Sequence, residues 1–166
     1  MITQQRLKEA LEYDAASGML RWRMPASRAV KPGQLAGRVS NRGYRQIMVD
    51  GVRYAAHRLV WLWHHGAFPE GEIDHRNGAR DDNRIENLRV ASRSENQQNI
   101  AGAQKDNKTG FLGVSFHAGN RWRAQISHDG RKRYLGLFSS PEDAHAAYLK
   151  AKATLHTFQP TLRSKK

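Results

Sequence analysis

The sequence predicts an α+β protein in two parts, and three observations lead to this fold class. In the N-terminal part, apolar residues at helical spacing and short strand-like runs follow one another. A polar linker over residues 103–109 then interrupts the apolar pattern. Beyond it, three alternating runs precede one Ala-rich helical segment, which predicts a three-stranded antiparallel sheet packed on one helix.

The first elements are short. Thr3 can cap a helix in which Leu7, Ala10 and Leu11 share one face. Residues 19–23 are expected to form a strand, and residues 26–34 combine Pro, Lys and Arg without periodicity, which favours a basic loop.

A hairpin and a helix are expected next. Residues 44–49 and 52–57 flank an Asp-Gly pair, a strong hairpin signal because glycine tolerates the positive φ of a tight turn. Residues 58–65 are aromatic and unbroken until Gly66, which favours a short buried helix.

A second hairpin followed by a helix is predicted in the middle of the chain. Residues 72–75 are extended, residues 76–84 are rich in turn formers, and residues 88–91 can return as the second strand. Ser92 then begins a helix, with Glu95 completing a capping box, and Gly102 is expected to stop it.

The C-terminal part alternates over residues 112–116 and 122–126, and a third run covers residues 132–138. Pro141, followed by two acidic residues, is a good helix start. The predicted domains are therefore residues 1–103 and 108–158.

The composition indicates a polyanionic partner. The formal net charge is +13, from 28 Lys and Arg against 15 Asp and Glu, and neutralising phosphates releases condensed counterions. The absence of cysteine excludes disulfides and thiolate zinc sites. Because the chain begins without a signal peptide and contains no stretch long enough to span a bilayer, we expect a soluble intracellular protein that is not secreted.

Four polar residues carry the candidate chemistry: Asp74, His75, Asn87 and Asn96. A hairpin that closes onto a helix can bring them around one point. Carboxylate and amide oxygens suit Mg²⁺, and histidine can take a proton from water near neutral pH. The alternative is that an Asp-His pair in a turn is structural, that Asn87 makes a turn and that Asn96 faces solvent.

Residues 55–100, which include the HRLVW and NLR segments around these four, resemble the HNH endonucleases of phages and mobile introns. The resemblance implies a ββα-metal core over about residues 72–102, in which Asp74 and Asn96 bind one divalent ion, Mg²⁺ or alternatively Mn²⁺. It also implies that His75 is the general base and that Asn87 orients the imidazole. Many HNH enzymes have histidine where this chain has Asn96. The asparagine form resembles the intron-encoded subgroup that nicks one strand as a monomer, so the resemblance implies a homing endonuclease.

Residues 108–156 resemble the plant APETALA/ethylene-response-factor DNA-binding domain, in the Gly113-Val114 pair, Trp122 and the YLG run. The resemblance implies that the sheet enters the major groove and the helix backs it. Alternation places Trp122 toward the helix, and it predicts a basic outer face. The residues predicted on that face are Arg121, Arg123, Gln125, Arg131 and Arg133. The alternative is a merely solvated charged face.

The predicted function is therefore metal-dependent hydrolysis of double-stranded DNA, without a small-molecule cofactor. The alternatives are a non-catalytic DNA-binding regulator on an HNH-like scaffold and a protein that binds or cleaves RNA. Arginines around the motif are candidate phosphate contacts: Arg76, Arg80, Arg84, Arg89 and Arg93. Further candidates in the N-terminal strands are Arg21, Arg23, Arg42 and Arg45. For His57, packing or phosphate contact is favoured over metal binding.

Overall fold

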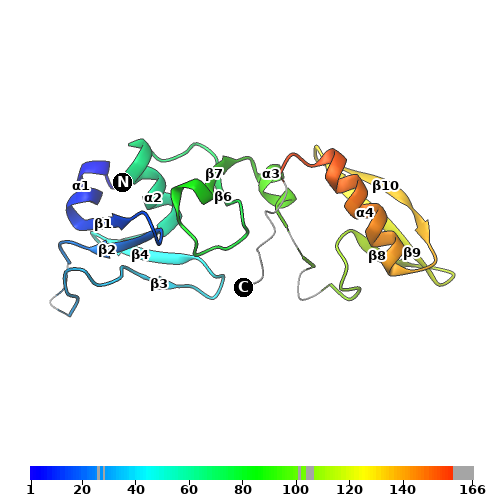
Figure 1. Cartoon of the computed structure of the whole chain (residues 1–166), viewed down its shortest axis with the longest axis horizontal. Coiled ribbons are helices and arrows are strands. Elements are labelled where there is room, and N and C mark those ends of the chain that lie inside the picture. The colour runs from blue at the N-terminus through cyan, green and yellow to red at the C-terminus, as the bar shows by residue number, and fades with distance from the viewer. Residues whose placement is uncertain (26, 28, 101, 104–106, 159–166) are drawn as a thin grey trace. The chain divides into compact units, whose positions relative to one another are not determined.

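The computed structural model describes residues 1–25, 27, 29–100, 102–103 and 107–158. The described chain contains both helices and antiparallel strands (Figure 1), so the predicted α+β class is confirmed. The chain divides into two compact units, Met1–Ala91 and Ser92–Lys166. The domain limits expected from the sequence stay a prediction. Within the described residues, no helix combines the length and the apolar character needed to cross a bilayer.

The first unit begins with a capped helix and a hairpin. Thr3 caps α1 (Gln4–Ala10), as predicted, since its hydroxyl accepts a hydrogen bond from Arg6 N. β1 (Leu11–Asp14) follows directly and pairs antiparallel with β2 (Met19–Trp22). Leu11 therefore begins a strand and does not extend the helix as expected, because no turn signal in the sequence separates β1 from α1.

The predicted basic loop over residues 26–34 has no helix or strand at its described positions. Ala26 and Arg28 lie outside the described residues.

A three-stranded antiparallel sheet and a helix come next. The strands β3 (Arg38–Val39), β4 (Arg45–Val49) and β5 (Val52–Ala55) lie in this order in the sheet. The hairpin of β4 and β5 is the predicted one, although β5 ends two residues earlier than expected because α2 (Ala56–His65) begins there. Gly66 ends α2 in the left-handed conformation.

The central hairpin is confirmed as well. β6 (Glu72–His75) pairs antiparallel with β7 (Leu88–Ala91), and the short 3-10 helix η1 (Ile85–Asn87) precedes β7. Ile73 and Leu88 from this hairpin join one apolar core with buried residues of α1, β2, β4 and α2. The hairpin is thus attached to the N-terminal elements through its apolar side chains.

The second unit begins with α3 (Arg93–Gln98), where Ser92 and Glu95 form the predicted capping box. This helix ends at Gln98, before the expected stop at Gly102, and residues 104–106 of the predicted linker lie outside the described residues.

The predicted C-terminal sheet and helix are both present. The elements are β8 (Val114–His117), β9 (Arg121–His128), β10 (Arg131–Phe138) and α4 (Pro141–Leu155). The sheet order is β10-β9-β8, with antiparallel pairing throughout. Val114, Ala124 and Ala144 form its buried centre, and Trp122 packs against them, as expected for a core tryptophan.

Candidate active site

The β6–β7 hairpin places Asp74 and His75 side by side at the end of a buried strand. Both are 4% exposed, and their cross-strand partners in the register are Arg89 and Leu88. A buried carboxylate beside a buried imidazole is costly unless polar partners surround both. The neighbouring turn and strand provide these partners.

His75 is held by Asn83, which is not among the site residues predicted from the sequence. Its Nε2 lies 3.2 Å from Oδ1 of Asn83, a side chain only 1% exposed. The amide orientation is supported because Asn83 Nδ2 donates to the carbonyl oxygen of Asp81 at 3.3 Å. Since Oδ1 can only accept, Nε2 carries the hydrogen, and Nδ1 is the basic nitrogen of the neutral imidazole.

Burial keeps this imidazole neutral. It lowers the pKa of His75 below the usual 6.5, and the hydrogen bond to Asn83 and the charges of nearby carboxylates oppose this effect only in part. A neutral histidine near pH 7 is the form that can accept a proton.

His57 packs against the same imidazole. Its ring centroid lies 5.2 Å from that of His75 and 5.4 Å from that of Tyr44, and both contacts are edge-on. Burial, and then the proximity of His75, lower the pKa of His57 to about 3. Its Nδ1 has no hydrogen-bond partner among the described residues. His57 thus packs against two rings, and the expected choice between packing and phosphate contact stays a prediction.

Asn87 closes the loop between the two strands. Its Oδ1 accepts from Asn77 N at 3.1 Å and its Nδ2 donates to Asp82 O at 2.7 Å. Its own carbonyl oxygen accepts from Arg76 N at 2.8 Å. Asn87 therefore contacts the loop at both ends, although it has no described hydrogen bond to the imidazole itself.

Two ion pairs fix the rest of the loop. Arg45, 8% exposed, donates from Nε and Nη2 to the two carboxylate oxygens of Asp81 at 3.0 and 2.8 Å. Arg84 makes the same two-pronged contact with Asp82, and this contact lowers the pKa of Asp82 to about 2. Arg45 and Arg84 therefore contribute to the structure of the loop, and their expected contacts with phosphate stay a prediction.

Asp74 is engaged by an arginine. Arg89 donates to Asp74 Oδ2 through Nε at 2.8 Å and contacts the same oxygen through Nη2 at 2.7 Å. The two side chains are 5% and 15% exposed. This pair partly neutralises the carboxylate that the sequence predicts as a metal ligand, and Arg89 is likewise not available to phosphate in this arrangement.

The donor chemistry of the predicted ligands fits a hard divalent ion. Asp74 offers a carboxylate and Asn96 an amide oxygen, and both are typical Mg²⁺ donors. Asn96 lies on α3, which belongs to the second unit. In the described ranges, no group of three or more His, Cys, Asp or Glu side chains is placed to hold a metal ion. The divalent ion implied by the resemblance is thus compatible with the donor chemistry of these two residues, and its identity stays a prediction.

The remaining predicted arginines near the motif are exposed. Arg76 and Arg80 lie in the loop after β6, and Arg93 lies at the start of α3. The Arg80 guanidinium stacks 5.2 Å over the Tyr44 ring, and it donates to the carbonyl oxygen of Arg42 at 2.9 Å. This contact fixes Arg80 at the edge of the loop.

The outer face of the C-terminal sheet differs from the predicted one in one strand. Arg121, Arg123 and Gln125 alternate on β9 with the residues that face α4, as expected. On β10, however, the register pairs Arg133 with Ile126 and pairs Tyr134 with Gln125. Paired residues point to the same side of a sheet, so Tyr134 and Lys132, not Arg131 and Arg133, extend the outer face. The tight turn of Asp129 and Gly130, between β9 and β10, sets this register.

Comparison with known proteins identifies one segment. Residues 54–98 match the family model described as HNH endonuclease, and this range contains α2, the β6–β7 hairpin and α3. No curated protein and no solved structure matched the chain. The match supports the predicted HNH family and indicates nuclease activity on DNA. It ends before the C-terminal sheet, so the resemblance of that sheet to the APETALA/ethylene-response-factor domain stays a prediction.

Proposed function

We propose that this protein is a metal-dependent DNA endonuclease that hydrolyses phosphodiester bonds with His75 as its general base. The observation that carries the proposal is the hydrogen bond between His75 Nε2 and Asn83 Oδ1, which lies inside the matched segment. It orients a neutral imidazole so that its basic nitrogen is Nδ1. Such an oriented base is a requirement of hydrolytic catalysis.

In the proposed reaction, His75 Nδ1 accepts a proton from water, and the water oxygen forms a bond to phosphorus. The bond between phosphorus and O3′ breaks, which leaves a 5′-phosphate and, after protonation, a 3′-hydroxyl. Asn83 and Asn87 act as positioning residues, one on the imidazole and the other on the loop. A divalent ion bound by Asp74 and Asn96 would stabilise negative charge on the phosphate and the leaving oxygen.

Arg89 gives the site a specific requirement. Because its guanidinium occupies Asp74 Oδ2, binding of a cation at this oxygen requires the arginine to move or to share the carboxylate. A guanidinium released beside the scissile bond is a strong phosphate ligand. The exchange of Arg89 for the ion is therefore part of the proposal.

We further propose that the enzyme is a site-directed, homing-type nuclease that acts as a monomer and cuts one strand. Asn96 in place of a histidine supports nicking, by resemblance, and the basic outer face of the C-terminal sheet supports a targeting role on duplex DNA. Arg121, Arg123 and Gln125 are the proposed contacts on that face.

A non-catalytic DNA-binding regulator is the second candidate, and the Arg89–Asp74 pair favours it. An arginine that permanently neutralises the carboxylate would leave an HNH-like scaffold without its ion. The two candidates differ in one measurable property, since only the first cleaves DNA when Mg²⁺ is present.

The test is conversion of supercoiled plasmid and of a duplex target library by the full-length protein with Mg²⁺ or Mn²⁺. We expect open circles from wild type and none from His75→Ala. His65→Ala is the matched control, because His65 is an exposed histidine at the end of α2, and it should retain activity.

Intact DNA with both ions would reject the nuclease in favour of the regulator. Linear product formed as fast as open circles would reject one-strand cutting but keep the nuclease. Preferential degradation of structured RNA at matched salt would instead support the RNA alternative.

A further inference from the structure

The outward side of the β3–β4–β5 sheet carries cationic, amide and apolar side chains together. On β4, Ile47 and Val49 are buried, so Gln46 and Met48 point to the opposite side. The register places Arg38 of β3 opposite Gln46 and Arg53 of β5 opposite Met48. We call the surface of these four residues, Arg38, Gln46, Met48 and Arg53, the sheet face. None of these four residues is among those to which a catalytic or metal-binding role is assigned.

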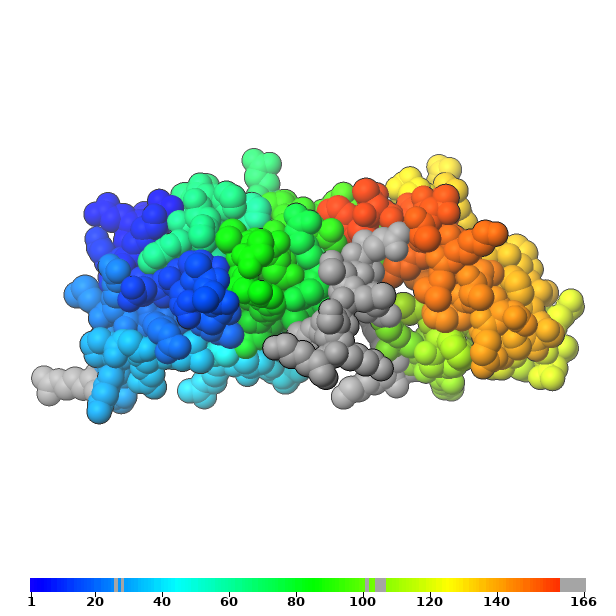
Figure 2. All heavy atoms as spheres, viewed as in Figure 1, coloured from blue at the N-terminus to red at the C-terminus, as the bar shows by residue number. Residues whose placement is uncertain are grey.

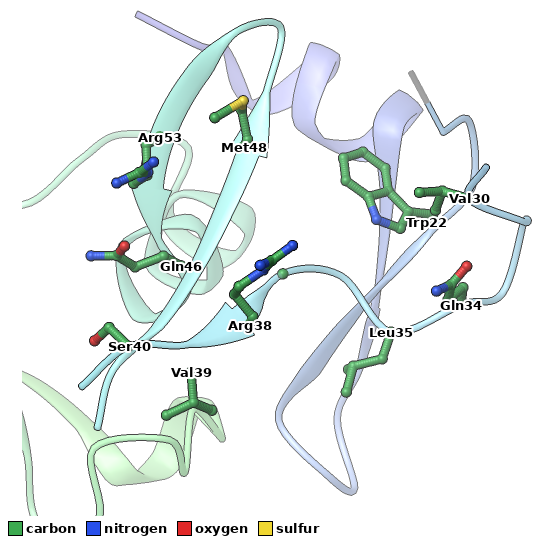
Figure 3. A pocket seen from close by; sticks show the side chains of 11 residues that line it. Trp22, Val30, Gln34, Leu35, Arg38, Val39, Ser40, Gln46, Met48 and Arg53 are labelled. Atoms are coloured by element: carbon green, nitrogen blue, oxygen red, sulfur yellow. The ribbon is translucent and has the colours of Figure 1, made fainter. Parts of the chain in front are cut away.

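The sheet face borders a hollow of about 670 Å³, which also reaches Trp22 of β2. Figure 3 shows Arg38 in the middle of this hollow, between the β4–β5 hairpin and Trp22. In the space-filling view, the segment of β3 and β4, coloured light blue to cyan, reaches the surface of the first unit (Figure 2). The hollow itself is partly open to solvent.

Its charge is uniformly positive. None of the described residues that line the hollow is acidic, while Arg38 and Arg53 both line it. Neither arginine forms an ion pair with any described residue, in contrast to Arg45 on the other side of the same sheet. Two guanidinium groups whose charge no carboxylate compensates fit an anionic partner.

The apolar residues restrict the partner further. Met48 is 54% exposed on the sheet face, and the half-buried Trp22 adds an indole to the lining of the hollow. Arginine and glutamine can bind phosphates and base edges, whereas methionine and indole can pack against deoxyribose. This mixture suits a nucleic-acid backbone better than a small inorganic anion.

The sheet face is connected to the candidate active site through the turn between β3 and β4. Ser40 of this turn lines the hollow, and Arg80, in the loop between β6 and β7, donates to Arg42 O in the same turn. The Arg45–Asp81 pair joins β4 to that loop a second time. A ligand on the sheet face is thus adjacent to a segment that contacts the site.

We propose that the sheet face binds the phosphate backbone of duplex DNA, on the part of the substrate that flanks the cleavage site. This inference rests on the proposed function in one respect, which is that duplex DNA is the substrate. It assigns to Arg38 and Arg53 the phosphate contacts, and to Met48 and Trp22 the contacts with sugars.

The experiment measures binding of the full-length protein to a fluorescent pool of randomised duplex DNA by anisotropy. EDTA is present throughout, so binding is observed without cleavage. The double variant Arg38→Gln/Arg53→Gln should bind about tenfold more weakly at about 0.1 M KCl, and its slope of log K against log salt should fall by about 2. Arg38→Lys/Arg53→Lys keeps both charges and should retain most of the slope.

Lys8→Gln is the matched control, because it removes one exposed charge from α1 in the same unit. It should leave both affinity and slope close to wild type. Met48→Glu, which adds a carboxylate to the sheet face, should weaken binding, while Leu149→Glu at the similarly exposed Leu149 of α4 should not.

Unchanged affinity and slope in the double variant would overturn the inference, as would an equal loss for Lys8→Gln. Preferential loss of RNA or acidic-peptide binding, with duplex binding retained, would overturn it too. If plasmid remains intact while the double variant loses duplex affinity, the nuclease proposal fails and the binding surface stands. If wild type cleaves plasmid but the double variant binds duplex DNA as well as wild type does, the nuclease proposal stands and the proposed binding surface fails.

Discussion

Replacing Asn83 by alanine tests whether this side chain, which the sequence did not single out, positions the catalytic base. The change removes the contact of Oδ1 with His75 Nε2 at 3.2 Å and the hydrogen bond from Nδ2 to Asp81 O at 3.3 Å. Each hydrogen bond contributes about 1 kcal/mol, and a buried polar group without a partner costs about 1–3 kcal/mol. We therefore expect the free energy of unfolding to fall by about 2–4 kcal/mol.

Activity should fall for a different reason. Without Asn83 Oδ1, the imidazole can rotate and either ring nitrogen can carry the hydrogen, so the basic nitrogen is no longer directed to one place. A displacement of about 1 Å in a reacting group can cost roughly 100-fold in rate. The loss should appear in kcat rather than in KM, because Asn83 is 1% exposed and has no access to bind DNA.

The assay is single-turnover plasmid nicking, at a temperature where circular dichroism shows every variant folded. Asn77→Ala is the matched control, since Asn77 lies in the same loop and also makes two side-chain hydrogen bonds, to Asp82 Oδ2 at 2.7 Å and from Ala79 N at 2.8 Å. It should lose stability but keep most of the rate. If folded Asn83→Ala nicks as fast as Asn77→Ala, the positioning role is refuted.

Three further predictions follow from the same contacts. Arg89→Gln removes the guanidinium from the 5% exposed Asp74 carboxylate, so the free energy of unfolding without metal should fall by about 3 kcal/mol. The variant should also gain more thermal stability from Mg²⁺ than wild type does. Equal Mg²⁺-induced shifts in melting temperature would contradict a metal site at Asp74. The folded-state pKa of His57, about 3, lies below its unfolded value of 6.5, so the unfolded state binds more protons between these values, and stability present above pH 6.5 is lost as the pH falls toward 3. In urea titrations between pH 8 and pH 5, the free energy of unfolding of His57→Phe should therefore decrease by about 2 kcal/mol less than that of wild type. Parallel pH profiles of the two proteins would reject this assignment. Gly18→Ala should destabilise the fold by more than about 2 kcal/mol, because Gly18 has φ +72° and an added Cβ would clash with the backbone of Asn83 and Arg84. Gly51→Ala is the control, because Gly51 has φ +76° with open space around it. An equal loss of stability in both variants would show that backbone strain at positive φ, and not the clash, is responsible.

The sequence predicted those elements whose signals are local. The Thr3 cap, the Asp-Gly turn between β4 and β5, and the capping box of Ser92 and Glu95 each lie within a few residues of the structure they specify. β3, in contrast, is only two residues long, and it exists through its pairing with β4 across an intervening turn. No local pattern distinguishes such a strand from loop.

The candidate site shows the same division. Asp74 and His75 were predicted from residue type and position, and the structure places them together on β6. Asn83 was missed because it stands in a run of polar turn formers, in which sequence does not distinguish the buried asparagine from its neighbours. Only the folding of the loop, attached through Arg45 and Asn87, turns that side chain toward His75.

The arginines show why net charge alone could not locate the DNA-binding surface. Arg45 and Arg38 lie on neighbouring strands of one sheet and contribute equally to the charge of +13. Alternation directs Arg45 inward, where Asp81 neutralises it, and the register directs Arg38 outward into a hollow without acidic lining. The same reasoning transfers the predicted outer face of β10 from Arg133 to Tyr134. Strand register, rather than composition, therefore decides which arginines can contact phosphate, and a one-residue slip would exchange the two sets.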